Sequence, residues 1–270
     1  MEIRLAALYV YPIKSMRGVA VPSARLDRWG LQHDRRYMLV DANGRFLTQR
    51  LHPRMALIQP HPMENGWMLN APGMPSLRLP LHPEGQPCRV TVWDDECDAL
   101  VLDATYAAWF SQFLAVPSRL VYFPDSAQRQ VDLSYASPGT QTSFSDGFPL
   151  LLANRASLDA LNKAMPQPVE MLRFRPNLVV SGAVEFDEDN WQQIKVGDVM
   201  IDVVKPCSRC VIPSIDFETG QRGQQPILDV LKQQRRKPDG KVYFGQNLIH
   251  REEGVLRVGD QVELILSVSE

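Results

Sequence analysis

Two cysteines with a polar pair between them lie in the segment KPCSRC. Cys207 and Cys210 flank Ser208 and Arg209. A thiolate is the form of cysteine that binds soft metals, and an arginine beside a thiol stabilises that form. Arginine and serine are also good hydrogen-bond partners for an anionic ligand. The segment therefore suits one thiolate on a metal, held by an anionic cofactor.

Four other interpretations of the pair exist. A structural zinc site needs four ligands, but Cys88 and Cys97 form no second Cys-x-x-Cys, and the histidines form no close pair. A thioredoxin-type dithiol begins a helix, and Val211, Ile212 and Pro213 are poor helix-start residues. An iron–sulfur cluster needs four thiolates, which the spacing does not supply. Two small core residues remain an open alternative, because buried free cysteine is common.

Other polar residues gather at the ends of expected strands. They form three clusters: Lys14, Ser15 and Arg17; Asp34, Arg35 and Arg36; and Arg173, Arg175 and Asn177. Each cluster alone is typical of a solvated strand end. Together they could line an anion-binding site where several strands end, since pockets often form there.

The residue pattern predicts a β-rich α+β fold with short helices. Apolar residues at helical spacing predict three helices. The first covers residues 103–114, with Asp103 as its N-cap, the second begins near Asn154 or Ser157, and the third covers residues 225–236. Runs of β-branched and aromatic residues predict strands within residues 4–15, 35–50, 88–102, 118–125 and 173–182.

Turn chemistry connects these elements. Asn43 and Gly44 between two strand-like runs indicate a hairpin. The proline- and glycine-rich residues 59–87 predict short edge strands and loops, and residues 126–142 a loop. Residues 194–204 and 256–266 each place Val-Gly-Asp before an alternating strand, a pattern common in small β-barrels. We expect two β-rich units with a boundary near residues 118–140.

Composition limits the class of partner. The 270-residue chain has a net charge of −2 and a pI near 6.2, which argues against general nucleic-acid or anionic-membrane binding. No apolar run approaches the length of a membrane span, and the first residues are typical of a strand rather than a signal peptide. Four cysteines are too few for a disulfide scaffold, so we expect a cytoplasmic protein with reduced thiols.

Several separated segments together resemble one family. YPIKSMRGV, DRRYMLV, FSDGFPLLL, RFRPNLVVSG, PCSRC and FGQN occur in this order across nearly the whole chain. The sequence resembles MOSC-domain proteins with an N-terminal MOSC β-barrel domain, such as bacterial YcbX-type proteins and the mitochondrial amidoxime-reducing component. The resemblance implies an N-terminal β-barrel-like domain over residues 1–120 and a MOSC β-barrel domain with short helices over residues 121–270.

The resemblance implies a molybdenum cofactor, a pyranopterin dithiolene that carries one molybdenum and a phosphate. The sequence has no plant-type cysteine run, so we expect no iron–sulfur cluster in this chain. Cys210 matches the cysteine that ligates the metal, and Cys207 is then a neighbour. The resemblance implies cofactor contacts from Lys14, Ser15, Arg35, Arg175, Asn177, Ser208 and Arg209, an acidic metal-site residue at Asp146, and a weaker match at Gln246 and Asn247.

The implied activity is molybdenum-dependent reduction of N-hydroxylated compounds: amidoximes, hydroxylamines and N-hydroxylated bases. Asp146 would donate a proton or position the N-hydroxy group. The chain shows no ferredoxin-like cysteine run, so we expect a separate flavoprotein or iron–sulfur protein to supply electrons. The alternatives are a molybdenum-cofactor carrier or sulfur-transfer module without reductase turnover, and a cofactor-free β-barrel binding protein.

Overall fold

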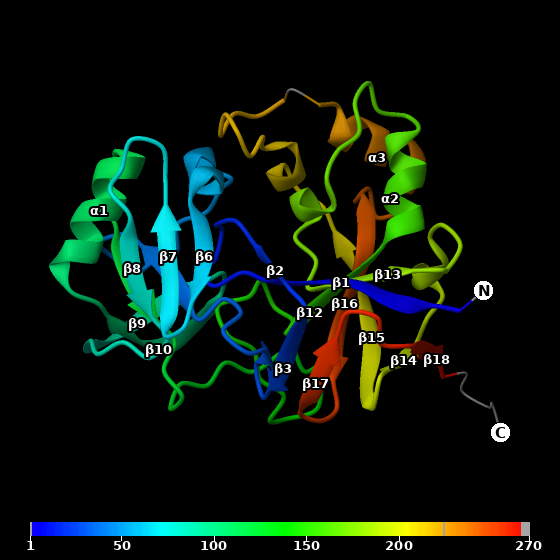
Figure 1. Ribbon diagram of the computed structural model, residues 1–270, viewed down its shortest axis with the longest axis horizontal. Coiled ribbons are helices and arrows are strands. Elements are labelled where there is room, and N and C mark those ends of the chain that lie inside the picture. Colours follow the sequence, from blue (N-terminus) through cyan, green and yellow to red (C-terminus); the bar gives the residue numbers. More distant parts are fainter. Residues whose placement is uncertain (1, 224, 266–270) are drawn as a thin grey trace.

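The computed structural model describes residues 2–223 and 225–265, and it consists of two β-rich halves joined side by side (Figure 1). The larger sheet has eight strands in the order β18-β14-β15-β16-β12-β13-β1-β2. These strands are β1 (Arg4–Val10), β2 (Val19–Val21), β12 (Leu150–Asn154), β13 (Leu178–Ser181), β14 (Gln193–Val196), β15 (Val199–Ser208), β16 (Tyr243–His250) and β18 (Val262–Leu264). The β-rich α+β prediction is confirmed.

The large sheet closes on itself through β1. One edge of β1 pairs antiparallel with β13. Near the start of the chain, the Val262 N–H donates to the Ile3 carbonyl at 2.9 Å, and the Leu5 N–H donates to the Asp260 carbonyl at 2.8 Å. A closed barrel has no free edge along this seam. The N-terminal strand is therefore part of the barrel formed by the second half of the chain.

The first half contains two smaller sheets. One has the order β5-β11-β10-β9, and the other β6-β7-β8. Their strands are β5 (Tyr37–Val40), β6 (Gln59–Met63), β7 (Gly66–Asn70), β8 (Leu77–Pro80), β9 (Gln86–Val92), β10 (Asp95–Val101) and β11 (Arg119–Tyr122). As expected for a proline-rich segment, the prolines of residues 59–87 lie on the edge strands β6, β8 and β9 or in loops.

A third small sheet links the halves. It has the order β17-β3-β4 and consists of β17 (Gly254–Arg257), β3 (Ser23–Asp27) and β4 (Gly30–Leu31). The largest hydrophobic cluster also spans both halves, since it contains Leu5 and Leu8 of β1, Phe110 of the first half and Val262 of β18. The division at residue 120 remains a prediction, because the halves exchange strands and share this core.

The predicted helices form. Helix α1 (Ala104–Leu114) begins after Asp103, whose carboxylate accepts the Thr105 N–H at 2.8 Å. Helix α2 (Arg155–Asn162) is capped in the same way by Asn154. Helix α3 (Ile227–Arg235) lies within the third predicted segment. Short 3₁₀ turns occur at η1 (Pro53–Leu57), η2 (Met171–Phe174), η3 (Asp187–Asp189) and η4 (Ile212–Ser214). Among the described residues, no helix has the length and apolar character needed to cross a bilayer.

The expected hairpin at Asn43 is only partly right. The turn forms, but one isolated bridge, between Val40 and Phe46, joins its arms. The second arm is not a strand, because its residues turn toward β9: Phe46 donates its N–H to the Thr91 carbonyl, and Arg45 forms an isolated bridge with Thr91. The residues that follow Phe46 form no strand of this sheet.

Both Val-Gly-Asp units form turns before strands. The first connects β14 to β15, with Gly197 at a φ of 57°, and the second precedes β18, with Gly259 at a φ of 98°. A positive φ is accessible to glycine at low cost, which explains its place in each turn. Residue 266, the end of the second predicted unit, lies outside the described residues.

Candidate functional site

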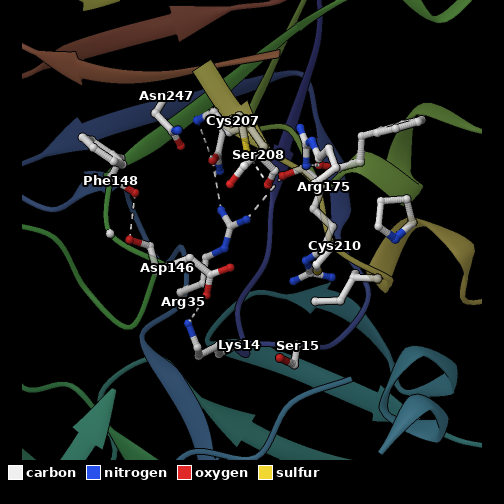
Figure 2. A pocket seen from close by; sticks show the side chains of 18 of the residues that line it. Lys14, Ser15, Arg35, Asp146, Phe148, Arg175, Cys207, Ser208, Cys210 and Asn247 are labelled. Carbon is white, nitrogen blue, oxygen red and sulfur yellow. Dashed lines mark hydrogen bonds and ion pairs between the residues drawn. The ribbon is translucent and has the colours of Figure 1, made fainter. Parts of the chain in front are cut away.

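A cavity of about 320 Å³ lies where the two halves meet. Its walls contain residues of the loops after β1 and around β5, of the segment before β12, and of the end of β15. Figure 2 shows Cys207, Ser208 and Asn247 on one side of the cavity, with Lys14 and Ser15 facing them. All ten predicted site residues line this cavity: Lys14, Ser15, Arg35, Asp146, Arg175, Asn177, Ser208, Arg209, Cys210 and Asn247.

The cavity wall is strongly cationic. Asp146 is the one carboxylate among its described lining residues. Seven cationic side chains line the same wall: Lys14, Arg35, Arg50, Arg173, Arg175, Lys205 and Arg209. The excess of positive charge is local to the cavity, since the net charge of the whole chain is −2. Such a concentration of positive charge in a cavity favours an anionic ligand.

Lys14 and Asp146 form an ion pair inside this cavity. The Lys14 Nζ donates to Asp146 Oδ1 at 2.5 Å and to the Phe144 carbonyl at 2.8 Å. The Trp93 Nε1 also donates to the Asp146 carboxylate, at 3.3 Å. The Lys14 side chain is 4% exposed, whereas the Asp146 side chain is 67% exposed and faces the open space. The carboxylate is therefore free to meet a ligand while the ammonium holds it.

The two charges of this pair influence each other. Partial removal from bulk water inside the cavity would raise the pKa of Asp146, but the charge and hydrogen bond of Lys14, with the charges of Arg50 and Arg35, hold that pKa well below its usual range. Burial lowers the pKa of Lys14 to about 8, although the Asp146 carboxylate opposes the shift. At neutral pH Asp146 is a carboxylate and Lys14 is an ammonium close to its titration.

Arg35 and Arg175 form a second cationic group. Their guanidinium carbons lie 4.2 and 4.4 Å from the centre of the buried Tyr11 ring. Arg35 Nη1 is held by the Asp34 carboxylate at 2.5 Å and by the Asn177 side-chain oxygen at 2.9 Å. Burial and the nearby Arg35 charge lower the pKa of Arg175 to about 10. Two crowded guanidinium groups with one close carboxylate would gain from a bound anion.

Strained backbone is concentrated around the cavity. Four lining residues other than glycine have left-handed φ angles: Ser15 (65°), Arg35 (48°), Trp93 (58°) and Arg175 (56°). Such conformations cost free energy, and they persist where surrounding contacts fix them, often at ligand sites. This strain could not be predicted from residue type, since none of these positions is a glycine.

Arg209 supports the cysteine loop. Its guanidinium donates to the Phe244 carbonyl at 2.8 and 2.6 Å and to the Phe174 carbonyl at 2.7 Å. These bonds fasten the end of β15 to β16 and to η2, so the side chain of Arg209 anchors the segment that presents Cys210. Burial raises the pKa of the neighbouring Cys207 thiol. Both cysteines line the cavity rather than a hydrophobic core, which disfavours the interpretation as core residues.

Arg50 is the functional candidate that the sequence did not reveal. Its Nε donates to Cys210 Sγ at 3.2 Å, and its guanidinium lies 4.5 Å from the centre of the Trp93 ring. Arg50 follows the part of the chain that leaves the sheet after the Asn43 turn. It is 160 residues from Cys210 in the sequence, and no motif surrounds it, so only the fold brings the two together.

The FGQN segment divides into one cavity residue and one structural residue. Asn247 lines the cavity and donates to the Lys205 carbonyl at 3.2 Å. Gln246 is 2% exposed, donates to Asp189 at 2.7 Å and does not line the cavity. Successive side chains of a strand point to opposite faces, and both residues lie on β16. The suggested cofactor contact of Gln246 is therefore wrong.

The donor set fits a pyranopterin cofactor with a phosphate. Two free thiols, Cys207 and Cys210, lie on the wall, and the arginine and lysine groups around Cys210 match an anionic molecule. The volume of about 320 Å³ is within the range of small-molecule sites. The crowded Arg35 and Arg175 charges supply a physical reason for a phosphate or pterin oxygen to bind there.

Comparison with known proteins shows the class. The MOSC N-terminal beta barrel domain matches residues 2–117, and the MOSC domain matches residues 139–263. The chain is 32% identical to mitochondrial amidoxime-reducing component 1 of Mus musculus and of Homo sapiens, in each case over 97% of this chain and 82% of the relative. It is 34% identical to component 2 of Rattus norvegicus, over 96% and 82%. The chain belongs to the family of MOSC-domain proteins that includes these amidoxime-reducing components.

Proposed function

We propose that this protein is a molybdenum-cofactor-dependent reductase of N-hydroxylated compounds that receives electrons from a separate protein in the cytoplasm. The observation that carries the proposal is the Cys210 thiol, which a guanidinium contacts inside a cation-lined cavity. Its relatives over nearly the whole chain are named for amidoxime reduction. The overall reaction breaks the N–O bond, consumes two electrons and two protons, and releases water with the reduced product, an amine from a hydroxylamine or an amidine from an amidoxime.

Named residues would hold the cofactor. Cys210 would supply the protein thiolate, and Arg50 would donate a hydrogen bond to its sulfur. Arg35 and Arg175 would bind the anionic oxygens of the phosphate or pterin, with Ser15 on the same wall. When bound, the cofactor supplies the two-electron redox chemistry that the protein side chains lack.

The side chains around Asp146 would handle the substrate and its proton. An ionised Asp146 is an acceptor, so it would receive the hydrogen bond of the substrate N-hydroxy group and orient it. Lys14, with a pKa near 8, is the acid that can supply a proton near neutral pH. Of the two roles expected for Asp146, positioning therefore has the stronger support, and the proton comes from its partner.

The proposal is tested by turnover and metal content together. Protein made in cells that synthesise the cofactor is assayed for reduction of benzamidoxime and 6-hydroxylaminopurine, with reduced methyl viologen as the electron source. We expect turnover by the wild type and its loss in Cys210→Ser. A Cys210→Ser protein that keeps its cofactor and full activity would refute the assignment. Cofactor binding and release without turnover by the wild type would instead support a carrier or sulfur-transfer module.

A further inference from the structure

A second cavity adjoins the first along the cysteine loop. It also has a volume of about 320 Å³. Ser208, Arg209, Cys210 and Arg50 line both cavities, so a molecule in the second lies beside the predicted metal ligand. The remaining wall consists of residues along helix α3 and at its C-cap, and of the turn that leads to β16. Neither the cofactor contacts nor the Lys14–Asp146 pair uses this wall.

The second cavity has no acidic residue among its described lining residues. Its five cations are Arg50, Arg209, Lys232, Arg236 and Lys241. One of these, Lys232, pairs with a carboxylate, that of Asp229, at 2.9 Å on the surface. The other four cationic side chains line the same cavity, and their mutual repulsion favours the binding of an anion there.

Two of the cations are available to a ligand. The Arg236 guanidinium donates one long hydrogen bond, at 3.3 Å, to the Gly240 carbonyl. No described carboxylate forms an ion pair with Arg236 or with Lys241. The nearest acidic residue in the sequence, Asp239, accepts instead from the Tyr243 hydroxyl at 2.5 Å and from the Lys241 backbone N–H at 3.0 Å. Both side chains are exposed, so they can turn toward a ligand without breaking a buried contact.

We propose that the second cavity is a subsite for a phosphate group carried by the substrate. The inference rests on the proposed reductase function and names its substrate class: phosphate monoesters with an N-hydroxylated ring, such as N-hydroxycytidine 5′-monophosphate. The N-hydroxy group lies in the first cavity beside Asp146, and the phosphate lies among Arg236, Lys241 and Lys232. Guanidinium and ammonium groups are the usual partners of phosphate in proteins.

The shape of the site favours a small molecule over an acidic protein. The cations line a hollow that reaches Cys210 and Ser208, and two apolar side chains, Leu228 and Val242, form part of its wall. A phosphate on a small substrate can enter such a hollow, whereas a protein partner would meet mainly its rim. The apolar residues would contact the sugar or ring between the two polar ends of the substrate.

The test compares ligands that differ only in the phosphate. Binding of cytidine and of cytidine 5′-monophosphate is measured by calorimetry on the molybdenum-loaded wild type and on the double variant Arg236→Gln/Lys241→Gln. A control variant, Lys163→Gln/Arg78→Gln, removes two exposed charges away from both cavities. We expect the wild type and the control to bind the monophosphate about tenfold or more tightly than the nucleoside. The double variant should lose most of that ratio, and added salt should reduce it.

Turnover separates this inference from the proposed function. With reduced methyl viologen as donor, kcat/KM for N-hydroxycytidine 5′-monophosphate should exceed that for N-hydroxycytidine, and the double variant should lose this preference. Equal binding of both ligands by the wild type, or an unchanged ratio in the double variant, would overturn the subsite. If the double variant keeps the ratio but fails only with a protein donor, the cations dock that donor and the subsite is wrong. Tight phosphate binding without any reduction would overturn the reductase and leave the phosphate site standing.

Discussion

Replacing Asp146 by asparagine separates the charge of the carboxylate from its shape. An asparagine side-chain oxygen can still accept the Lys14 ammonium hydrogen bond, which is 2.5 Å long in the native pair. The variant removes the negative charge that keeps the ammonium of Lys14 protonated up to a pH of about 8. Lys14 is 4% exposed, so it has little access to water as a substitute.

The size of the effect follows from Coulomb's law. Two unit charges 4 Å apart interact by about 4 kcal/mol at an effective dielectric constant near 20, and by about 1 kcal/mol in bulk water. Asp146 is 67% exposed, so the pair lies between these limits, at roughly 1.5–3 kcal/mol. Since one pKa unit corresponds to about 1.4 kcal/mol, the pKa of Lys14 should fall by about 1–2 units in Asp146→Asn.

The assay is the pH dependence of kcat for benzamidoxime between pH 5.5 and about pH 10, with molybdenum per chain measured on each sample. The wild type should lose activity as pH rises through about 8 or above, because Lys14 then loses its proton. In Asp146→Asn this loss should begin about 1–2 pH units lower, and Lys14→Arg should show no such loss below about pH 10. Molybdenum content should be kept, since the variant makes the cavity more positive.

A matched control uses another exposed carboxylate on a buried cation. Asp125 is 68% exposed and pairs at 2.6 Å with the buried Arg36, outside the cavity. Asp125→Asn should leave the alkaline limit of kcat in place. The same alkaline limit in Asp146→Asn as in the wild type would refute the reasoning. The stability of the wild type gives a second readout: the folded pKa of Lys14 lies below 10.5, so its contribution to the unfolding free energy should rise between about pH 8 and 10.5.

Three further changes have defined outcomes. Arg209→Met removes three charge-assisted hydrogen bonds to backbone carbonyls and should lower the unfolding free energy, measured by urea titration, by about 3 kcal/mol or more. Arg209→Lys should recover only part of the lost free energy. An unchanged urea midpoint in Arg209→Met would contradict the anchoring role. Gly245→Ala places a Cβ against a strand carbonyl oxygen at a φ of 76° and should cost more than about 1 kcal/mol in thermal unfolding, whereas a neutral result would show that the strand shifts freely. Arg50→Met should lower kcat about tenfold, because the contact with Cys210 is lost. Arg54 lies outside both cavities, so Arg54→Met should have the kcat of the wild type. Equal kcat values in the two variants would show that Arg50 has no role in the site.

Local chemistry made much of the fold predictable. The cap at Asp103, the apolar spacing of residues 103–114 and the Val-Gly-Asp turns each act over a few residues, and each formed as expected. The edge strands within residues 59–87 follow from proline, which cannot donate to a central ladder. The second arm of the Asn43 hairpin was wrongly predicted to be a strand, because its contact with β9 depends on a sheet that only the folded chain provides.

The candidate site was predictable where motifs surround the residues. Lys14, Arg175 and Cys210 lie in recognisable segments, and the fold brings all three to one cavity. Arg50 has no motif, so its contact with the thiol depends on long-range packing. Gln246 was misassigned although strand alternation beside Asn247 could have separated the two faces.

The way in which the two halves share strands could not be predicted from the sequence, because it depends on long-range strand pairing. β1 and β2 pair within the barrel of the second half, although they begin the chain. This arrangement places Lys14 and Ser15, which follow β1, directly opposite the cysteine loop. The site therefore depends on contacts between distant segments, such as that of Arg50 with Cys210 across 160 residues, which periodicity and turn signals do not encode.

The most direct measurement of the central claim is molybdenum per chain, by elemental mass spectrometry, on wild type and Cys210→Ala purified from cofactor-producing cells. A Cys207→Ala protein serves as the matched control, because both thiols line the cavity. The account predicts about one molybdenum per chain in the wild type and in Cys207→Ala, and its loss in Cys210→Ala. A well-expressed wild type without molybdenum, or an equal content in Cys210→Ala, would contradict it.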